Sequence, residues 1–196
     1  MRKLSQFLGS GTPISRPVVE ADFAASLVEE AEWNRSVQAT EIYAGLFPGG
    51  SREINDPSTG GSLADQLRGV DSYVYFGDRL LTVDDKAQKP KYSDSILIEQ
   101  FSSIEAGSPG WSVDDKKDND CVLYVWIPSN LALLVSREEV YQASVEWCKD
   151  DRYPLRRVPN KGYTTGVKYI PHLEFSNHVK CRWWRDGKLQ QHPIEG

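Results

Sequence analysis

The chain has 196 residues, of which 39% are hydrophobic and 11% aromatic, and its formal net charge is −5. This apolar content is sufficient for a buried core and excludes a wholly disordered chain. The longest apolar runs, 121–128 and 131–135, are far shorter than the roughly 20 residues that cross a bilayer, so we expect no membrane partner.

Three regions differ in composition. Residues 1–17 are polar, with Gly, Ser and Pro, and predict a flexible lead-in without the apolar stretch of a signal peptide. Residues 18–150 predict the core domain, and residues 151–196 predict a basic extension packed on that core. The charge balance is −10 over residues 1–150 and +5 over residues 151–196. Three cysteines without a C-x-x-C pair or a zinc-ligand spacing to histidine indicate reduced thiols and a cytoplasmic location.

The first half of the core domain predicts one helix and three strands. Apolar residues recur every three or four positions over 20–46, which indicates a long helix ended by Pro-Gly-Gly. Two strand-like runs, 69–76 and 79–86, flank a Gly-Asp pair and predict a hairpin. The apolar run 95–103 predicts a third strand.

The second half predicts two strands and a helix. Residues 121–127 are almost continuously apolar, which favours a strand buried on both faces, and 131–136 predict the next strand. Ser136 with Glu139 forms a capping box at the start of a helix that extends to 149. Beyond residue 150, repeated Pro and Gly predict an irregular segment with short strands at most.

Three charged residues cluster at the hairpin. Asp71 begins its first strand, and Asp84 and Lys86 end the second, so the hairpin would bring them together. Residues two apart on a strand share a face, so Asp84 and Lys86 should project together and Asp85 should project oppositely, with its backbone carbonyl near the site. Ordinary surface ion pairs and strand-end caps are the alternative explanation.

Two neighbouring carboxylates favour a divalent cation. Asp71 and Asp84 would repel each other without a cation between them, and Mg²⁺ or Mn²⁺ prefers such oxygen ligands. The ion would lower the pKa of a bound water, and Lys86 would stabilise charge that develops on a phosphate. This chemistry predicts phosphodiester hydrolysis.

On these residues the chain resembles the PD-(D/E)xK phosphodiesterase superfamily of restriction-type nucleases. Asp71 matches the first acid, Asp84 the second acid and Lys86 the lysine, and stretches such as "ADQLRGVD" and "SILIEQFSS" look similar to phage-type members. The resemblance implies an α/β fold with an αβββαβ core, a mixed central sheet flanked by helices, and a helix glutamate as a further metal ligand. Glu32 or Glu29 is favoured for that role, although Glu30 and Glu41 compete. Two departures are Val70 in place of proline and Asp in place of the commoner Glu at the second acid.

The sequence also predicts supporting roles in metal or nucleic-acid binding for residues outside this cluster. Glu99, inside an apolar strand, would help hold the metal or the lysine, or face solvent. Basic residues interleaved with aromatics suit contacts with nucleic acid, and the alternative is ordinary surface solvation. The candidates are Lys89, Lys91, Arg156, Arg157, Lys161, Arg182 and Arg185.

Two functions follow from this pattern. The first is a Mg²⁺- or Mn²⁺-dependent nuclease acting on DNA, with RNA as an open alternative, that leaves a 5′-phosphate as the resemblance implies and is active as a monomer or a homodimer. The second is a catalytically silent protein of a phage or mobile element that keeps the fold and binds or inhibits a protein partner. A helix glutamate facing Asp71 and Asp84 would favour the enzyme.

Overall fold

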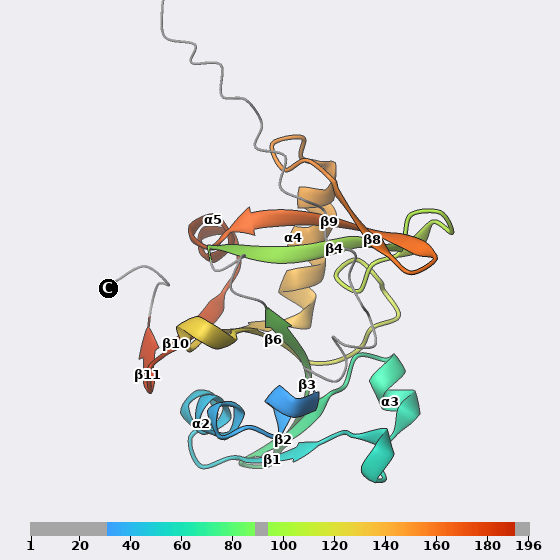
Figure 1. The fold of residues 1–196 in the computed structure, drawn as a ribbon. Coiled ribbons are helices and arrows are strands. Elements are labelled where there is room, and N and C mark those ends of the chain that lie inside the picture. Colours follow the sequence, from blue (N-terminus) through green and yellow to red (C-terminus); the bar gives the residue numbers. More distant parts are fainter. Residues whose placement is uncertain (1–30, 89–93, 191–196) are drawn as a thin grey trace, which may run out of the picture.

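Two β-sheets organise the protein in the computed structural model, which describes residues 31–88 and 94–190 (Figure 1). The first sheet is antiparallel except for the parallel pair β3–β6, so it is mixed. Its strands, in spatial order, are β1 (Ser51–Ile54), β2 (Ser72–Phe76), β3 (Arg79–Gln88), β6 (Cys121–Trp126), β7 (Leu131–Ser136), β10 (Cys181–Arg185) and β11 (Lys188–Gln190). The second sheet is antiparallel, in the order β5 (Ser108–Pro109), β4 (Ser95–Ser103), β9 (Tyr163–Pro171) and β8 (Arg156–Asn160).

The helices in the described ranges are few and short. They are α2 (Val37–Leu46), α3 (Leu63–Leu67), α4 (Arg137–Lys149), α5 (His172–His178) and the 3₁₀ turns η1 (Pro57–Thr59) and η3 (Ile127–Ser129). The α4 helix begins as predicted, because the side chain of Ser136 accepts a hydrogen bond from the amide of Glu139. None of the helices in these ranges is both long and apolar enough to cross a membrane.

The helix predicted over 20–46 is not continuous in its described part. Helical residues 31–34 are followed by a turn at Arg35 and Ser36, and α2 then starts afresh. The Ser36 side chain accepts a hydrogen bond from the amide of Ala39 at 3.1 Å, which makes it an N-cap rather than a residue inside a helix. Residues 20–30 of the prediction lie outside the described residues.

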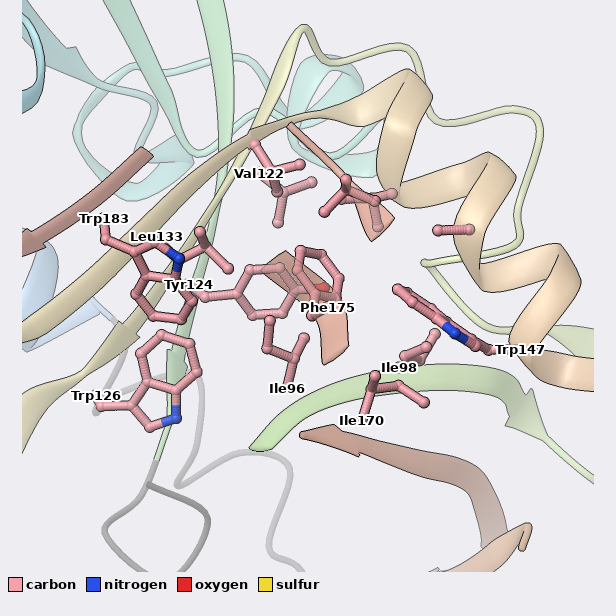
Figure 2. Close-up of a cluster of buried hydrophobic side chains, with 14 of the residues drawn as sticks. Ile96, Ile98, Val122, Tyr124, Trp126, Leu133, Trp147, Ile170, Phe175 and Trp183 are labelled. Carbon is pink, nitrogen blue, oxygen red and sulfur yellow. The ribbon is translucent and has the colours of Figure 1, made fainter. Parts of the chain in front are cut away.

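Two hydrophobic cores lie on opposite faces of the first sheet. One is enclosed by the second sheet, α4 and α5, and Figure 2 shows Tyr124, Trp126, Trp147, Phe175 and Trp183 in it. The other is covered by α2. The strand predicted from 121–127 is confirmed as buried on both faces, because alternate residues of β6 enter the two cores.

The third predicted strand does not continue the hairpin. The strand exists as β4, but it pairs with β5 and β9 in the second sheet, and the position beside β3 is taken by β6. Ile96 and Ile98 project from β4 into the core between the sheets. The run 95–103 is therefore apolar because β4 faces the first sheet across this core. The protein is thus an α/β structure with a mixed seven-stranded sheet and a second antiparallel sheet.

The prediction for the chain after residue 150 is only partly confirmed: the short strands allowed over 164–175 and 179–190 are present, but the segment is more regular than predicted. That part of the chain supplies strands to both sheets, because β9 pairs with β4 and β10 pairs with β7. The proline and glycine residues there do not prevent pairing: Gly166 lies within β9 and is paired on both sides, and Pro159 is paired near the end of β8. Gly162, with φ +90°, makes the β8–β9 turn. The basic C-terminal part is therefore integral to the fold.

Burial of His172 makes stability depend on pH. Its ring lies 4.4 Å from that of Trp126, and desolvation lowers its pKa from 6.5 to about 4, against the opposing charge of Asp94. Between these values the unfolded chain binds a proton that the folded protein does not, so stability should fall as pH falls from about 6.5 to 4. The expected loss is about 3 kcal/mol, at 1.36 kcal/mol per pKa unit. Urea unfolding across this range should show a shallower pH dependence for His172→Phe; equal pH dependence in both proteins would contradict the account.

Candidate functional site

The predicted hairpin is present and places Asp71 beside the middle of β3, which continues past Lys86 to Gln88. Strands β2 and β3 pair from Ser72–Val83 to Phe76–Arg79, and the Asp71 amide donates to the Val83 carbonyl at 2.9 Å. Gly77, with φ +59°, supplies the left-handed conformation that the tight turn requires. The hairpin predicted from the sequence is therefore confirmed.

Asp84 and Lys86 project from the same face of β3, as predicted. The Lys86 Nζ lies 2.5 Å from Asp84 Oδ1 and 5.2 Å from the centre of the Trp111 ring. In the parallel register these two residues lie beside Val122 and Tyr124 of β6, which face the second sheet. The pair therefore lies between the two sheets, at the margin of the larger core.

The Asp84 carboxyl is almost completely buried, with 2% of the residue exposed. Burial raises its pKa to about 8; the Lys86 charge opposes this rise, and the Asp71 charge adds to it. Repulsion from Asp71 shows that the two acids are close enough to interact, as the sequence predicted. A positive charge at this position would favour the ionised form of both.

Asp85 points to the opposite face, also as predicted, into a buried polar network. Its carboxylate accepts hydrogen bonds from Tyr43 (2.6 Å) and Ser72 (2.9 Å) and pairs with Arg52 at 3.2 Å. Burial raises the Asp85 pKa to about 6, against the Arg52 charge. The Asp85 amide donates to Asp71 Oδ2 at 2.9 Å, so the network fixes the strand that orients Asp71. The Asp85 carbonyl as a metal ligand stays a prediction.

Glu99 lies near the lysine. Burial raises its pKa, while hydrogen bonding from the Trp111 amide at 3.3 Å and the nearby Lys86 charge lower it. The Trp111 segment is in turn held by Arg137, whose guanidinium donates to backbone carbonyls at Trp111, Ser112 and Asp114. The supporting position predicted for Glu99 is therefore consistent with its surroundings.

Three residues at or next to the site were missed by the sequence patterns. Arg52 stands in a short polar strand, and only its buried partners reveal its role. The sequence around Tyr124 indicates only a core residue. Its buried hydroxyl, however, has no hydrogen-bond partner among the described residues, and burial and the Asp84 charge raise its pKa. Asn119 lies in the charged run 114–120, which carries no periodic signal.

The predicted helix glutamate is not found in the described part of the chain. Glu32 is exposed, because its neighbours Trp33 and Asn34 are the helix residues that turn inward. Within residues 31–88 and 94–190 no group of three or more His, Cys, Asp or Glu side chains could hold a metal ion, so Glu32 does not join Asp71 and Asp84. Glu29 lies outside the described residues.

The predicted nucleic-acid contacts do not form one strip. Arg156, Arg157 and Lys161 are exposed on the β8–β9 hairpin of the second sheet, whereas Arg182 and Arg185 are on β10 of the first. Lys89 and Lys91 lie outside the described residues. The tryptophans next to Arg182 are both buried, one in each core, so neither is available to stack on a base.

A cavity of about 390 Å³ lies on the other side of the first sheet. It is lined by residues of α2, β1 and β2, including Tyr43, Phe47 and Arg52, and by none of Asp71, Asp84 and Lys86. The Arg52 guanidinium there is already engaged by Asn34, Ser72 and Asp85. The cavity therefore does not extend the cluster at β3.

The cluster as a whole is a half-buried polar site in which two carboxylates and one ammonium group converge between two sheets. Comparisons of the chain with protein-family models, with curated proteins and with solved structures found no match. The chemistry of these side chains is therefore the basis for a functional conclusion.

Proposed function

We propose that this protein is a divalent-metal-dependent nuclease that hydrolyses phosphodiester bonds of DNA. The observation that carries the proposal is the pairing of Asp84 and Lys86 on one face of β3 with the Asp71 carboxylate beside them. The resemblance to PD-(D/E)xK nucleases gives these three residues the same roles. The helix α2, the β2–β3 hairpin and the mixed sheet are compatible with a restriction-endonuclease-like core, whereas β4 departs from it.

The donor set suits Mg²⁺ or Mn²⁺. Asp71 and Asp84 offer carboxylate oxygens, and the raised pKa of Asp84 reflects a negative charge that burial and Asp71 disfavour. When bound, the ion would supply an acidified water and polarise a phosphodiester. Lys86, with 27% of its side chain exposed, can present its ammonium group to a phosphate oxygen while it remains near Asp84.

Contacts with nucleic acid are proposed for the exposed basic residues. Arg156, Arg157 and Lys161 share one hairpin, where guanidinium and ammonium groups can neutralise phosphates. Arg182 and Arg185 would meet a different part of the duplex, because they stand on the other sheet. RNA is the alternative substrate.

Two observations favour the second candidate, a catalytically silent protein that binds or inhibits a protein partner. Within the described ranges no third acidic side chain accompanies Asp71 and Asp84. The Lys86 ammonium group already compensates part of the charge on Asp84. A structural ion pair at a strand end would have these two properties as well.

Cleavage of linear, circular and single-stranded DNA, with and without Mg²⁺ or Mn²⁺, tests the proposal. We expect metal-dependent cutting that falls about a hundredfold or more in Asp84→Ala and in Lys86→Ala, because each loses a group that acts on the reacting phosphate or its metal. Asp151→Ala and Lys149→Ala remove an exposed acid and an exposed lysine and should cut normally. A folded wild-type protein that cuts neither DNA nor RNA would refute the nuclease and direct the search to protein partners.

A further inference from the structure

Asn119 has a buried side chain in which one polar atom lacks a hydrogen-bond partner among the described residues. Only 3% of the residue is exposed, and its Nδ2 donates to the Cys121 carbonyl at 2.7 Å. Its Oδ1 has no hydrogen-bond partner among the described residues. A buried acceptor without a partner costs about 1–3 kcal/mol, so such atoms in folded proteins call for a ligand or a bound water.

The unpartnered oxygen faces the same small space as the catalytic acid. A Cβ placed on Gly69 would lie 3.1 Å from Asn119 Oδ1, 3.3 Å from Lys117 Cδ and 3.6 Å from Asp84 Oδ2, so both oxygens border the position beside this glycine. The Lys117 side chain passes the same position, and its ammonium group donates to the Leu67 carbonyl at 2.6 Å. Gly69 has a φ of +89°, and it leads directly into the segment that carries Asp71. Any side chain at 69 would enter this space, which glycine leaves open.

The two oxygens of Asp84 have different surroundings. Oδ1 pairs with the Lys86 ammonium group at 2.5 Å, whereas Oδ2 is the oxygen that borders the space shared with Asn119. The amide of Asn119 is held by Cys121, so Oδ1 cannot exchange places with Nδ2 without losing that bond. One oxygen of Asp84 thus pairs with the lysine, and the other borders the same space beside Gly69 as the amide oxygen of Asn119.

A hard divalent cation fits this pair of oxygens. Mg²⁺ and Mn²⁺ bind carboxylate and amide oxygens, with water completing the coordination. A neutral amide oxygen is sufficient as the third ligand, because the two carboxylates already balance the charge of a divalent ion. The site would then need no glutamate from a helix.

We infer that Asn119 Oδ1 is a ligand of the divalent cation held by Asp71 and Asp84, and that it replaces the helix glutamate that the resemblance implied. This inference rests on the proposed metal-dependent function. It places the third ligand on the segment that leads into β6, next to the strand that carries Asp84.

Binding of Mn²⁺ to the full chain without DNA, measured by isothermal titration calorimetry, tests the inference independently of cleavage. Removing the amide in Asn119→Ala should weaken binding at least about tenfold. Asn119→Asp keeps an oxygen at this position and should bind Mn²⁺ at least as tightly as wild type. Asn160→Ala removes an amide on β8 that bonds to Val158 and Thr165, and should leave the affinity unchanged.

The outcomes separate the two proposals. If wild type binds Mn²⁺ and cuts DNA while Asn119→Ala binds equally well, the ligand assignment is overturned and the nuclease stands. If Asn119→Ala fails to fold, tenfold weaker binding by a folded Asn119→Asp overturns the assignment. If wild type binds no Mn²⁺, the assignment and the metal-dependent function fail together.

Discussion

Arg52→Met is expected to lower the free energy of unfolding by about 3–5 kcal/mol, because it leaves Asp85 as a buried charge without a counterion. The Asp85 side chain is fully buried and that of Arg52 is 11% exposed, so water cannot replace the guanidinium without rearrangement. The same guanidinium lies 3.9 Å from the centre of the Tyr43 ring and donates to the Asn34 carbonyl at 2.8 Å, and methionine replaces neither contact. Urea denaturation at pH 8 measures the loss.

The matched control is Arg35→Met. Arg35 also pairs with an aspartate, Asp56, but half of its side chain is exposed, and such surface pairs contribute about 0–1 kcal/mol. Adding Asp85→Asn to Arg52→Met should recover part of the lost stability, because the uncompensated charge is then absent. Equal losses in the Arg35 and Arg52 variants would contradict a buried ion pair.

Asp84→Asn is expected to stabilise the metal-free protein at pH 8 while it abolishes cleavage. The folded pKa of Asp84 is raised to about 8 from 3.8, so the unfolded chain releases this proton near pH 4 and the folded protein retains it until near pH 8. The contribution of Asp84 to stability should therefore fall as pH rises through this window, by roughly 6 kcal/mol at 1.36 kcal/mol per unit. Asparagine has no titratable proton at this position, so the variant should become increasingly more stable than the wild type as the pH rises.

Chemical denaturation from pH 5 to 8 in the presence of EDTA provides the comparison. Asp151→Asn, at an exposed carboxyl, should follow the wild type throughout. Asp85, with its pKa near 6, makes the stability of all three proteins fall as pH rises, but by less than Asp84 does in the wild type. A constant difference between wild type and Asp84→Asn across the range would show that Asp84 is ionised in the folded state.

The parts of the site that follow local rules were predictable from the sequence. The period of two along β3 placed Asp84 and Lys86 on one face and Asp85 on the other, and the turn at Gly77 brought Asp71 alongside. The apolar run of β6 likewise indicated burial on both faces. Each of these inferences needs only strand geometry and neighbours along the chain.

The long-range pairings were not predictable in this way. The apolar pattern of β4 is compatible with a place beside β3 and equally with a place across the core. Its actual partner is β9, which lies beyond residue 160, so the local sequence could not identify it. The glutamate sought on a helix was inferred from resemblance and is not among the ligands in the described ranges. Asn119 and Arg52 sit in polar stretches whose periodicity carries no information, and only their buried contacts identify them.

The parallel pairing of β3 with β6 also sets when the site can exist during synthesis. Asp71, Asp84 and Lys86 leave the ribosome well before Asn119 and the strand that flanks β3. Contacts between segments so far apart along the chain form late, after loop closure has been overcome. A nascent or partly folded chain therefore displays the acidic hairpin without the strand that flanks it, and the cation binding proposed for this site should arise only with the completed sheet.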